Sequence, residues 1–181
     1  MNMNKLIEQC HGAAVAGGWW NDTETGESIE RNKGELLCLV HSEISEVLEG
    51  LESGAYDDHL TDRRMEEVEL ADVLIRVFDY AGGFGLRLEN NLNYRTEDLS
   101  SDPYKLLCEM HAKTSAAMES ARKGRSNMEA FNLEMLVSIV IYYASLFDYD
   151  LEATIQEKLA YNAKRADHKP ENREKDGGKK F

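Results

Sequence analysis

Apolar residues recur every three to four positions along most of the chain, which is the spacing of an amphipathic α-helix. One such arc covers residues 36–51 and consists of Leu36, Leu37, Val40, Ile44, Val47, Leu48 and Leu51. Residues 68–79 are apolar around most of the helix circumference and leave one narrow polar stripe: Glu69, Asp72, Arg76 and Asp79. The pattern predicts an all-α fold in which the second stretch is a central helix.

Capping and turn residues mark the expected ends of the helices in the first half. The first helix is expected over residues 4–16, before two glycines. Asn32 is the expected N-cap of a second helix, which closes at Gly54. A third helix is expected to end near Ala81, before another pair of glycines, and a short helix to span residues 86–94.

The second half of the chain repeats the first. Residues 36–54 align without a gap on residues 106–124, and seven of the aligned positions are identical. Most of the acids of the first half are replaced: Glu43 aligns with Lys113, Glu46 with Ala116 and Asp72 with Val137, whereas Glu69 aligns with Glu134. We therefore expect an internal pseudo-twofold with one working site where two could have been.

The expected organisation is a single all-α domain over residues 1–169, a helical bundle built from two tandem halves. The halves are residues 1–95 and 101–169, and Asp102 followed by Pro103 marks the first helix of the second half. Residues 170–181 are rich in charge and glycine and are expected to form a flexible tail.

Charge and composition exclude several classes of protein. The net charge of −13, from 34 acidic and 21 basic residues, excludes a protein that coats nucleic acid. No stretch approaches the roughly 20 apolar residues of a membrane span, and the first residues lack a signal-peptide pattern. We expect a cytoplasmic protein without membrane or nucleic-acid partners. Cys10, Cys38 and Cys108 lack C-x-x-C spacing and are expected to be buried thiols.

Two acid pairs stand out, Glu43 with Glu46 and Glu69 with Asp72. Residues three apart lie on the same side of a helix, so two such helices packed together can collect four carboxylates at one point. Carboxylate oxygens at that density suit Mg²⁺ or Mn²⁺. The simpler alternative is that each pair lies on a solvated helix face.

The two acid pairs resemble the signature of the MazG-like all-α nucleoside triphosphate pyrophosphohydrolases, a superfamily that includes the tandem-repeat dimeric dUTPases. Lys158, Tyr161, Asn162 and Arg165 are similar to the family's K-x-x-Y-N-x-x-R tail, and His168-Lys169 to the residues that follow it. The resemblance covers roughly residues 6–169. Two features depart from it: Ser42 replaces a frequent glutamate, and the end of the first half is a poor match to the tail.

The resemblance implies hydrolysis of a (d)NTP to a (d)NMP and pyrophosphate. It implies that Glu43, Glu46, Glu69 and Asp72 hold two or three Mg²⁺ or Mn²⁺ ions across the phosphates. Glu46, with Glu43 beside it, is the expected catalytic group that accepts a proton from the attacking water.

The same resemblance places cationic and amide groups on the phosphates. Lys158, Arg165 and Lys169 are the candidates to neutralise charge, with Tyr161 and Asn162 donating hydrogen bonds. The alternative for these residues is a solvated helix end.

The base is expected to stack on an aromatic surface. Trp19 and Trp20 are the candidates for this stacking, although paired tryptophans also close the ends of helical bundles. Asn21 and Asp22 supply acceptors that would suit guanine, so the substrate is expected to be a purine, and in particular a guanine, (d)NTP.

Alternatives from other classes stay open. A pyrophosphatase for dUTP, dCTP or modified nucleotides would share the acid cluster, and so would a catalytically inactive nucleotide-binding helical protein. A ferritin-like di-iron bundle requires Glu-x-x-His motifs on two of its helices, and the sequence has only one, Glu8 with His11. The family resemblance also implies a homo-oligomer, as a dimer or a dimer of dimers.

Overall fold

The protein is described by a computed structural model that covers residues 1–22, 24–89, 98–165 and 172. These residues form six helices: α1 (Met3–Ala16), α2 (Lys33–Ser53), α3 (Met65–Gly83), α4 (Pro103–Arg122), α5 (Ser126–Leu146) and α6 (Leu151–Asn162). The described residues contain no strand beyond two isolated β-bridges. The predicted all-α fold is confirmed.

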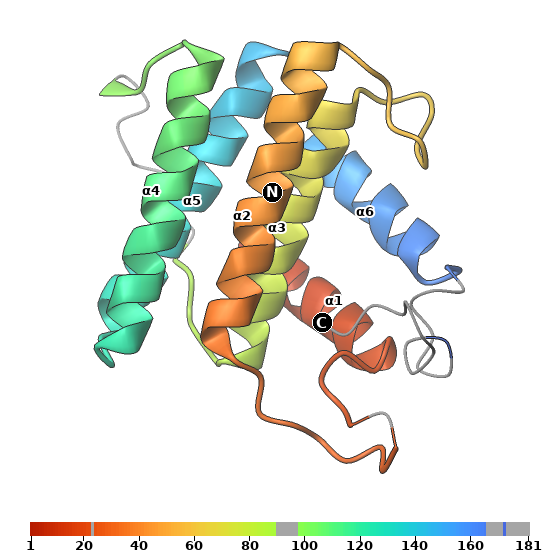
Figure 1. The fold of residues 1–181 in the computed structure, drawn as a ribbon, viewed down its shortest axis with the longest axis vertical. Helices are drawn as coiled ribbons and strands as arrows, with labels where there is room; N and C mark the ends of the chain where they lie inside the picture. Colours follow the sequence, from red (N-terminus) through yellow and green to blue (C-terminus); the bar gives the residue numbers. More distant parts are fainter. Residues whose placement is uncertain (23, 90–97, 166–171, 173–181) are drawn as a thin grey trace.

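Helix α3 is the centre of the molecule. It packs against α1, α2, α5 and α6, while α2 also packs against α4 and α4 against α5 (Figure 1). Val68, Leu74 and Phe78 of α3 are fully buried, in a hydrophobic core that extends from Met3 to Ile155. The apolar pattern of residues 68–79 therefore has the expected cause, which is burial on nearly every side.

The predicted helix starts and stops are largely confirmed. The side chain of Asn32 caps α2 by accepting hydrogen bonds from two backbone N–H groups, and Asp102 caps α4. The chain leaves α2 at Gly54, whose φ of 63° is left-handed and favours glycine. Asn2 and Asp150 cap α1 and α6 in the same way.

The expected stop of α3 near Ala81 is two residues too early, because α3 continues to Gly83. The glycine pair allows close packing and does not end the helix. A Cβ atom at Gly82 would overlap the ring of His11, and one at Gly83 would overlap the ring of Trp20. The turn comes at Gly85, which has a left-handed φ of 62°.

The predicted helix over residues 86–94 is wrong in its described part. Residues 86–89 are not helical, and the remaining five lie outside the described residues. Leu88 enters the core at 2% exposure, and the backbone N–H of Glu89 donates to Glu134 at 2.7 Å. The Glu134 side chain on α5 thus accepts the hydrogen bond that a backbone carbonyl would have accepted in a helix.

Contacts between α3 and α5 occur in reciprocal pairs. The Tyr80 hydroxyl donates to Glu129 at 2.6 Å, and 63 residues further along the chain the Tyr143 hydroxyl donates to Glu66 at 3.3 Å. If the two halves are related by this interval of 63 residues, Glu69 corresponds to Asn132. The sequence alignment instead pairs Glu69 with Glu134, two residues later. The pseudo-twofold relation of the halves stays a prediction.

His41 of α2 and His111 of α4, which occupy aligned positions in the two halves of the sequence, contact each other. Their Nδ1 atoms are 2.7 Å apart and their ring planes differ by 13°. One ring must donate and the other accept, so the pair links the two helices through an N–H···N hydrogen bond between His41 and His111.

The prediction of buried thiols is wrong for two of the three cysteines. Cys10 is buried at 1% exposure, whereas Cys38 and Cys108 are exposed. On α2 the inward arc is occupied by Leu36, Leu37 and Val40, which leaves Cys38 on the outer side.

Helix α5 is the one described helix that is long and apolar enough to cross a membrane by length and composition, although no such segment was expected. In its most apolar window, 61% of the residues are buried against the rest of the molecule. A central helix of a bundle has the same properties, so this is weak evidence for a membrane span.

The close approach of Trp20 to α3 can be tested at Gly83. We expect Gly83→Ala to lower the free energy of unfolding by about 1–3 kcal/mol, because the added methyl group forces the indole ring out of its place. Gly12→Ala is the matched control, since no atom lies within 4 Å of the added group and alanine favours the helix. Urea denaturation of both variants measures the difference; equal stabilities would contradict the packing assigned to Trp20.

Candidate functional site

A cavity of about 730 Å³ opens between α1, α2, α3 and α6, a size typical of small-molecule sites. Five acids line it: Glu43, Glu46, Glu69, Asp72 and Asp79. Four cationic side chains line it as well: Arg31, Arg76, Lys158 and Arg165. The concentration of opposite charges in one partly enclosed space identifies it as the candidate functional site.

The polar stripe of α3 faces this cavity along its whole length. Its four residues all belong to the lining, and Glu69 and Asp79 are only 6% and 9% exposed. The stripe is therefore not a solvated face of a central helix, which was the simpler interpretation of the sequence.

The predicted acid pairs of α2 and α3 converge. Carboxylate oxygens of Glu43, Glu69 and Asp72 lie within 4.8 Å of one another. Glu46, one turn further along α2 than Glu43, lines the same cavity. Among the described residues, Glu43, Glu69 and Asp72 are the one group of three or more acid, histidine or cysteine side chains whose ligand atoms lie this close together.

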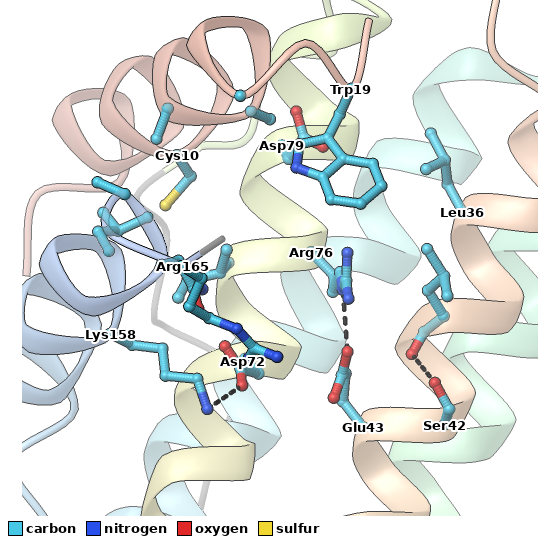
Figure 2. A pocket seen from close by; sticks show the side chains of 18 of the residues that line it. Cys10, Trp19, Leu36, Ser42, Glu43, Asp72, Arg76, Asp79, Lys158 and Arg165 are labelled. Atoms are coloured by element: carbon cyan, nitrogen blue, oxygen red, sulfur yellow. Dashed lines mark hydrogen bonds and ion pairs between the residues drawn. The ribbon is translucent and has the colours of Figure 1, made fainter. Parts of the chain in front are cut away.

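Two cations hold part of the acid cluster. Arg76 Nε donates to Glu43 at 2.9 Å, which links α3 to α2, and Lys158 Nζ lies 2.8 Å from Asp72 and links α6 to α3 (Figure 2). Lys158 is only 4% exposed. The two ion pairs reduce the repulsion between the carboxylates and hold α6 against the cavity.

These two cations do not neutralise the whole acid cluster. Burial, reinforced by the charge of Asp72, raises the pKa of Glu69 to about 9. Burial raises the pKa of Asp72, with Lys158 opposing the shift, and burial also raises the pKa of Glu46. Without a further cation the cluster thus holds a proton at neutral pH.

The donor set fits a hard divalent cation. All the convergent ligands are carboxylate oxygens, and Mg²⁺ binds such oxygens at about 2.1 Å. Oxygens within 4.8 Å of one another need only small side-chain rotations to share an ion. A cation would also replace the proton on Glu69, so the electrostatics and the donor chemistry agree.

The far end of the cavity is built around Asp79. One of its carboxylate oxygens, Oδ1, accepts from Trp20 Nε1 at 2.8 Å and lies 2.9 Å from His11 Nδ1. Burial raises the pKa of Asp79, and these two partners oppose the rise. Trp20 is 7% exposed and lies outside the cavity lining, as in the alternative in which it closes the end of the bundle.

Trp19 lies in the lining next to Arg31, and its ring is at the end of the cavity away from Asp72 (Figure 2). Asn21 is not in the lining; its side-chain amide donates to the Gly26 carbonyl within the loop. The Asp22 carboxylate is likewise used inside the loop, by Thr25 and Glu24. The Asp22 acceptor that suggested guanine thus serves the loop itself, and Asn21 is held in the same loop through its donor.

The predicted tail residues divide between two positions. Lys158, Asn162 and Arg165 line the cavity, and Figure 2 shows the Arg165 side chain directed toward its acidic part. Tyr161 is not in the lining and packs on the ring of His59 at 4.9 Å. Lys169 lies outside the described residues.

Sequence analysis did not assign site roles to Arg76, Asp79 or Arg31. The signal for Arg76 and Asp79 was present, because both continue the stripe of Glu69 and Asp72 along α3. Arg31 lies in an irregular segment before the α2 cap, where no periodicity indicates which way a side chain points.

Comparison with known proteins gives no identification. No protein-family model matches the chain, and neither the curated proteins nor the solved structures contain a significant match.

The raised pKa of Glu69 predicts an unusual pH dependence in the absence of metal. The folded state keeps a proton on Glu69 up to about pH 9, whereas the unfolded chain releases it near the ordinary value of 4.5. The stability contributed by this group is therefore lost as the pH rises between these values, by up to about 1.4 kcal/mol per pH unit. Glu69→Gln should remove this slope.

Urea denaturation in EDTA between pH 5.5 and 8.5 measures the slope. Glu49→Gln, on the exposed outer face of α2, is the control and should keep the wild-type slope. If Glu69→Gln and wild type have the same pH dependence, Glu69 does not carry the retained proton.

Proposed function

We propose that the protein hydrolyses a nucleoside triphosphate, (d)NTP, to a (d)NMP and pyrophosphate with the help of Mg²⁺ or Mn²⁺. The observation that carries the proposal is the convergence of Glu43, Glu69 and Asp72 in a cavity that Lys158 and Arg165 also line. Clustered carboxylates next to cationic side chains are what a metal-bound polyphosphate requires.

Glu43, Glu46, Glu69 and Asp72 would hold two or three ions. When bound, the ions would neutralise phosphate oxygens and acidify a water molecule. The resemblance to MazG-like pyrophosphohydrolases led to the same four residues, and their placement in one cavity supports that reading.

Glu46 has the properties expected of the proton acceptor. It lines the cavity and has no direct ion pair within the described part of the chain, and burial raises the pKa of its carboxyl group toward the working range of a general base. As Glu46 takes the proton, the water oxygen bonds to the α-phosphorus and the bond to the bridging oxygen breaks. Pyrophosphate leaves with that oxygen.

The cations have separate tasks in this scheme. Lys158 is held by Asp72 in the free protein, and its pKa is raised by that carboxylate although burial alone would lower it. Lys158 therefore stays charged and would bind a phosphate of the substrate, while Asp72 would be one of the residues that hold the metal ion. Arg165, which follows the end of α6 and lines the cavity, would neutralise the outer phosphates.

Product analysis tests the reaction. Each (d)NTP is incubated with the protein and Mg²⁺ or Mn²⁺, and monophosphate, diphosphate and pyrophosphate are resolved. We expect monophosphate and pyrophosphate in equal amounts. Release of inorganic phosphate with a diphosphate would contradict the assigned bond cleavage, and nucleotide binding without turnover would favour the inactive nucleotide-binding alternative.

Site variants test the residue roles. Glu46→Gln should lower kcat by roughly 10²–10⁴-fold, because it removes the proton acceptor and keeps the side-chain shape. Asp72→Asn should weaken metal binding and activity together. Glu52→Gln, further along α2 and exposed, is the matched control and should retain activity. Full activity in Asp72→Asn would overturn the metal assignment.

A further inference from the structure

Arg31 is a buried cation with an unused donor. Its side chain is 8% exposed, and Nη1 donates to the Trp19 carbonyl at 2.6 Å. Nη2 is shielded from water and has no hydrogen-bond partner among the residues that the structure describes. A buried donor without an acceptor costs free energy, so a folded protein that keeps one at a cavity wall is expected to receive the acceptor from outside.

Nearby carboxylates compensate only part of the cost of burying the charge of Arg31. Burial lowers the pKa of its guanidinium, which is opposed by the charges of Asp79 and Glu35 and reinforced by that of Arg76. Its guanidinium carbon lies 5.9 Å from the centre of the Trp20 ring. Asp79 already has both Trp20 and His11 on one oxygen. Among these side chains, Nη2 of Arg31 is therefore the hydrogen-bond donor that is left without an acceptor.

The distance between Arg31 and the acid cluster indicates which part of the substrate Arg31 would contact. Asp79, whose charge acts on Arg31, is seven residues after Asp72 on α3, and a helix rises about 1.5 Å per residue, so the two are about 10 Å apart along α3. If the phosphates lie at Asp72 and Lys158, the other end of the nucleotide reaches the wall formed by Trp19 and Arg31. That end carries the base.

We infer that Arg31 selects the base, by donating from Nη2 to a keto oxygen on the edge of the ring that is far from the sugar. This inference rests on the proposed function. Guanine and hypoxanthine present O6 at that edge, and uracil and thymine present O4. Adenine and cytosine present an amino group there, which would point N–H against N–H and leave the donor of Arg31 unpaired.

Two pairs of substrates test the keto group at constant ring size. dITP differs from dATP, and dUTP from dCTP, by a keto oxygen in place of an amino group and by an N–H in place of the adjacent ring nitrogen acceptor, so the Arg31 variant is needed to assign the preference to the keto oxygen. We expect wild-type kcat/KM to favour the keto member of each pair by roughly ten- to a hundredfold, the size of a hydrogen bond to a charged donor. Arg31→Met should bring both ratios close to one, mainly by slowing the keto substrates.

Control variants separate this role from folding. Arg122→Met removes an exposed arginine on α4 that pairs with Glu119 far from the lining, and should leave both ratios unchanged. Arg31→Lys keeps the charge and a donor and should keep part of the preference. Should Arg31→Met fail to fold, Arg31→Lys carries the test: a wild-type ratio together with a wild-type free energy of unfolding would then overturn the assignment.

Binding of nucleosides separates the failure of this inference from the failure of the proposed function. Deoxyinosine and deoxyadenosine are titrated calorimetrically in EDTA, so that neither metal nor phosphate contributes. We expect deoxyinosine to bind more tightly, and Arg31→Met to abolish the difference. A preference for deoxyinosine without hydrolysis of any (d)NTP would refute the reaction and support Arg31. Hydrolysis with wild-type keto-to-amino ratios near one would refute the role of Arg31 alone.

Discussion

The burial of charge along one side of α3 is the constraint on which the rest of the structure depends. A helix packed against four others would ordinarily be apolar throughout, yet α3 carries Glu69, Asp72, Arg76 and Asp79. Each buried charge needs a partner, since an isolated charge in the interior is strongly destabilising. Glu43 on α2, Lys158 on α6, and His11 and Trp20 from the N-terminal segment supply partners for Arg76, Asp72 and Asp79.

This requirement explains why the short helices α1 and α6 close on α3. Apart from apolar contacts, each of them contributes a polar group to the stripe: His11 from α1 to Asp79, and Lys158 from α6 to Asp72. The cavity is the space that remains between these partners. The same interactions that stabilise the fold therefore place acidic and basic groups around one ligand-sized volume.

Charge balance divides the cavity into two ends with different chemistry. At the acid end, Glu43, Glu69 and Asp72 outnumber their cations, and burial together with the charge of Asp72 raises the pKa of Glu69. At the other end, Nη2 of Arg31 is a donor that no group in the described part of the chain accepts. One end thus lacks a cation and the other an acceptor, and a metal-bound nucleotide would supply both.

The sequence by itself determined most of the helices, the burial of α3 and the four acids of α2 and α3 that line one cavity, because helical periodicity reports directly which side of a helix meets the core. Only the tertiary structure decided which helix supplies each counter-charge. It also decided that Gly82 and Gly83 admit His11 and Trp20, that Cys38 is exposed, and that Arg31 faces the cavity. The physical reason is that periodicity is a property of one helix, whereas an ion pair or a close approach depends on the register between two segments distant in sequence.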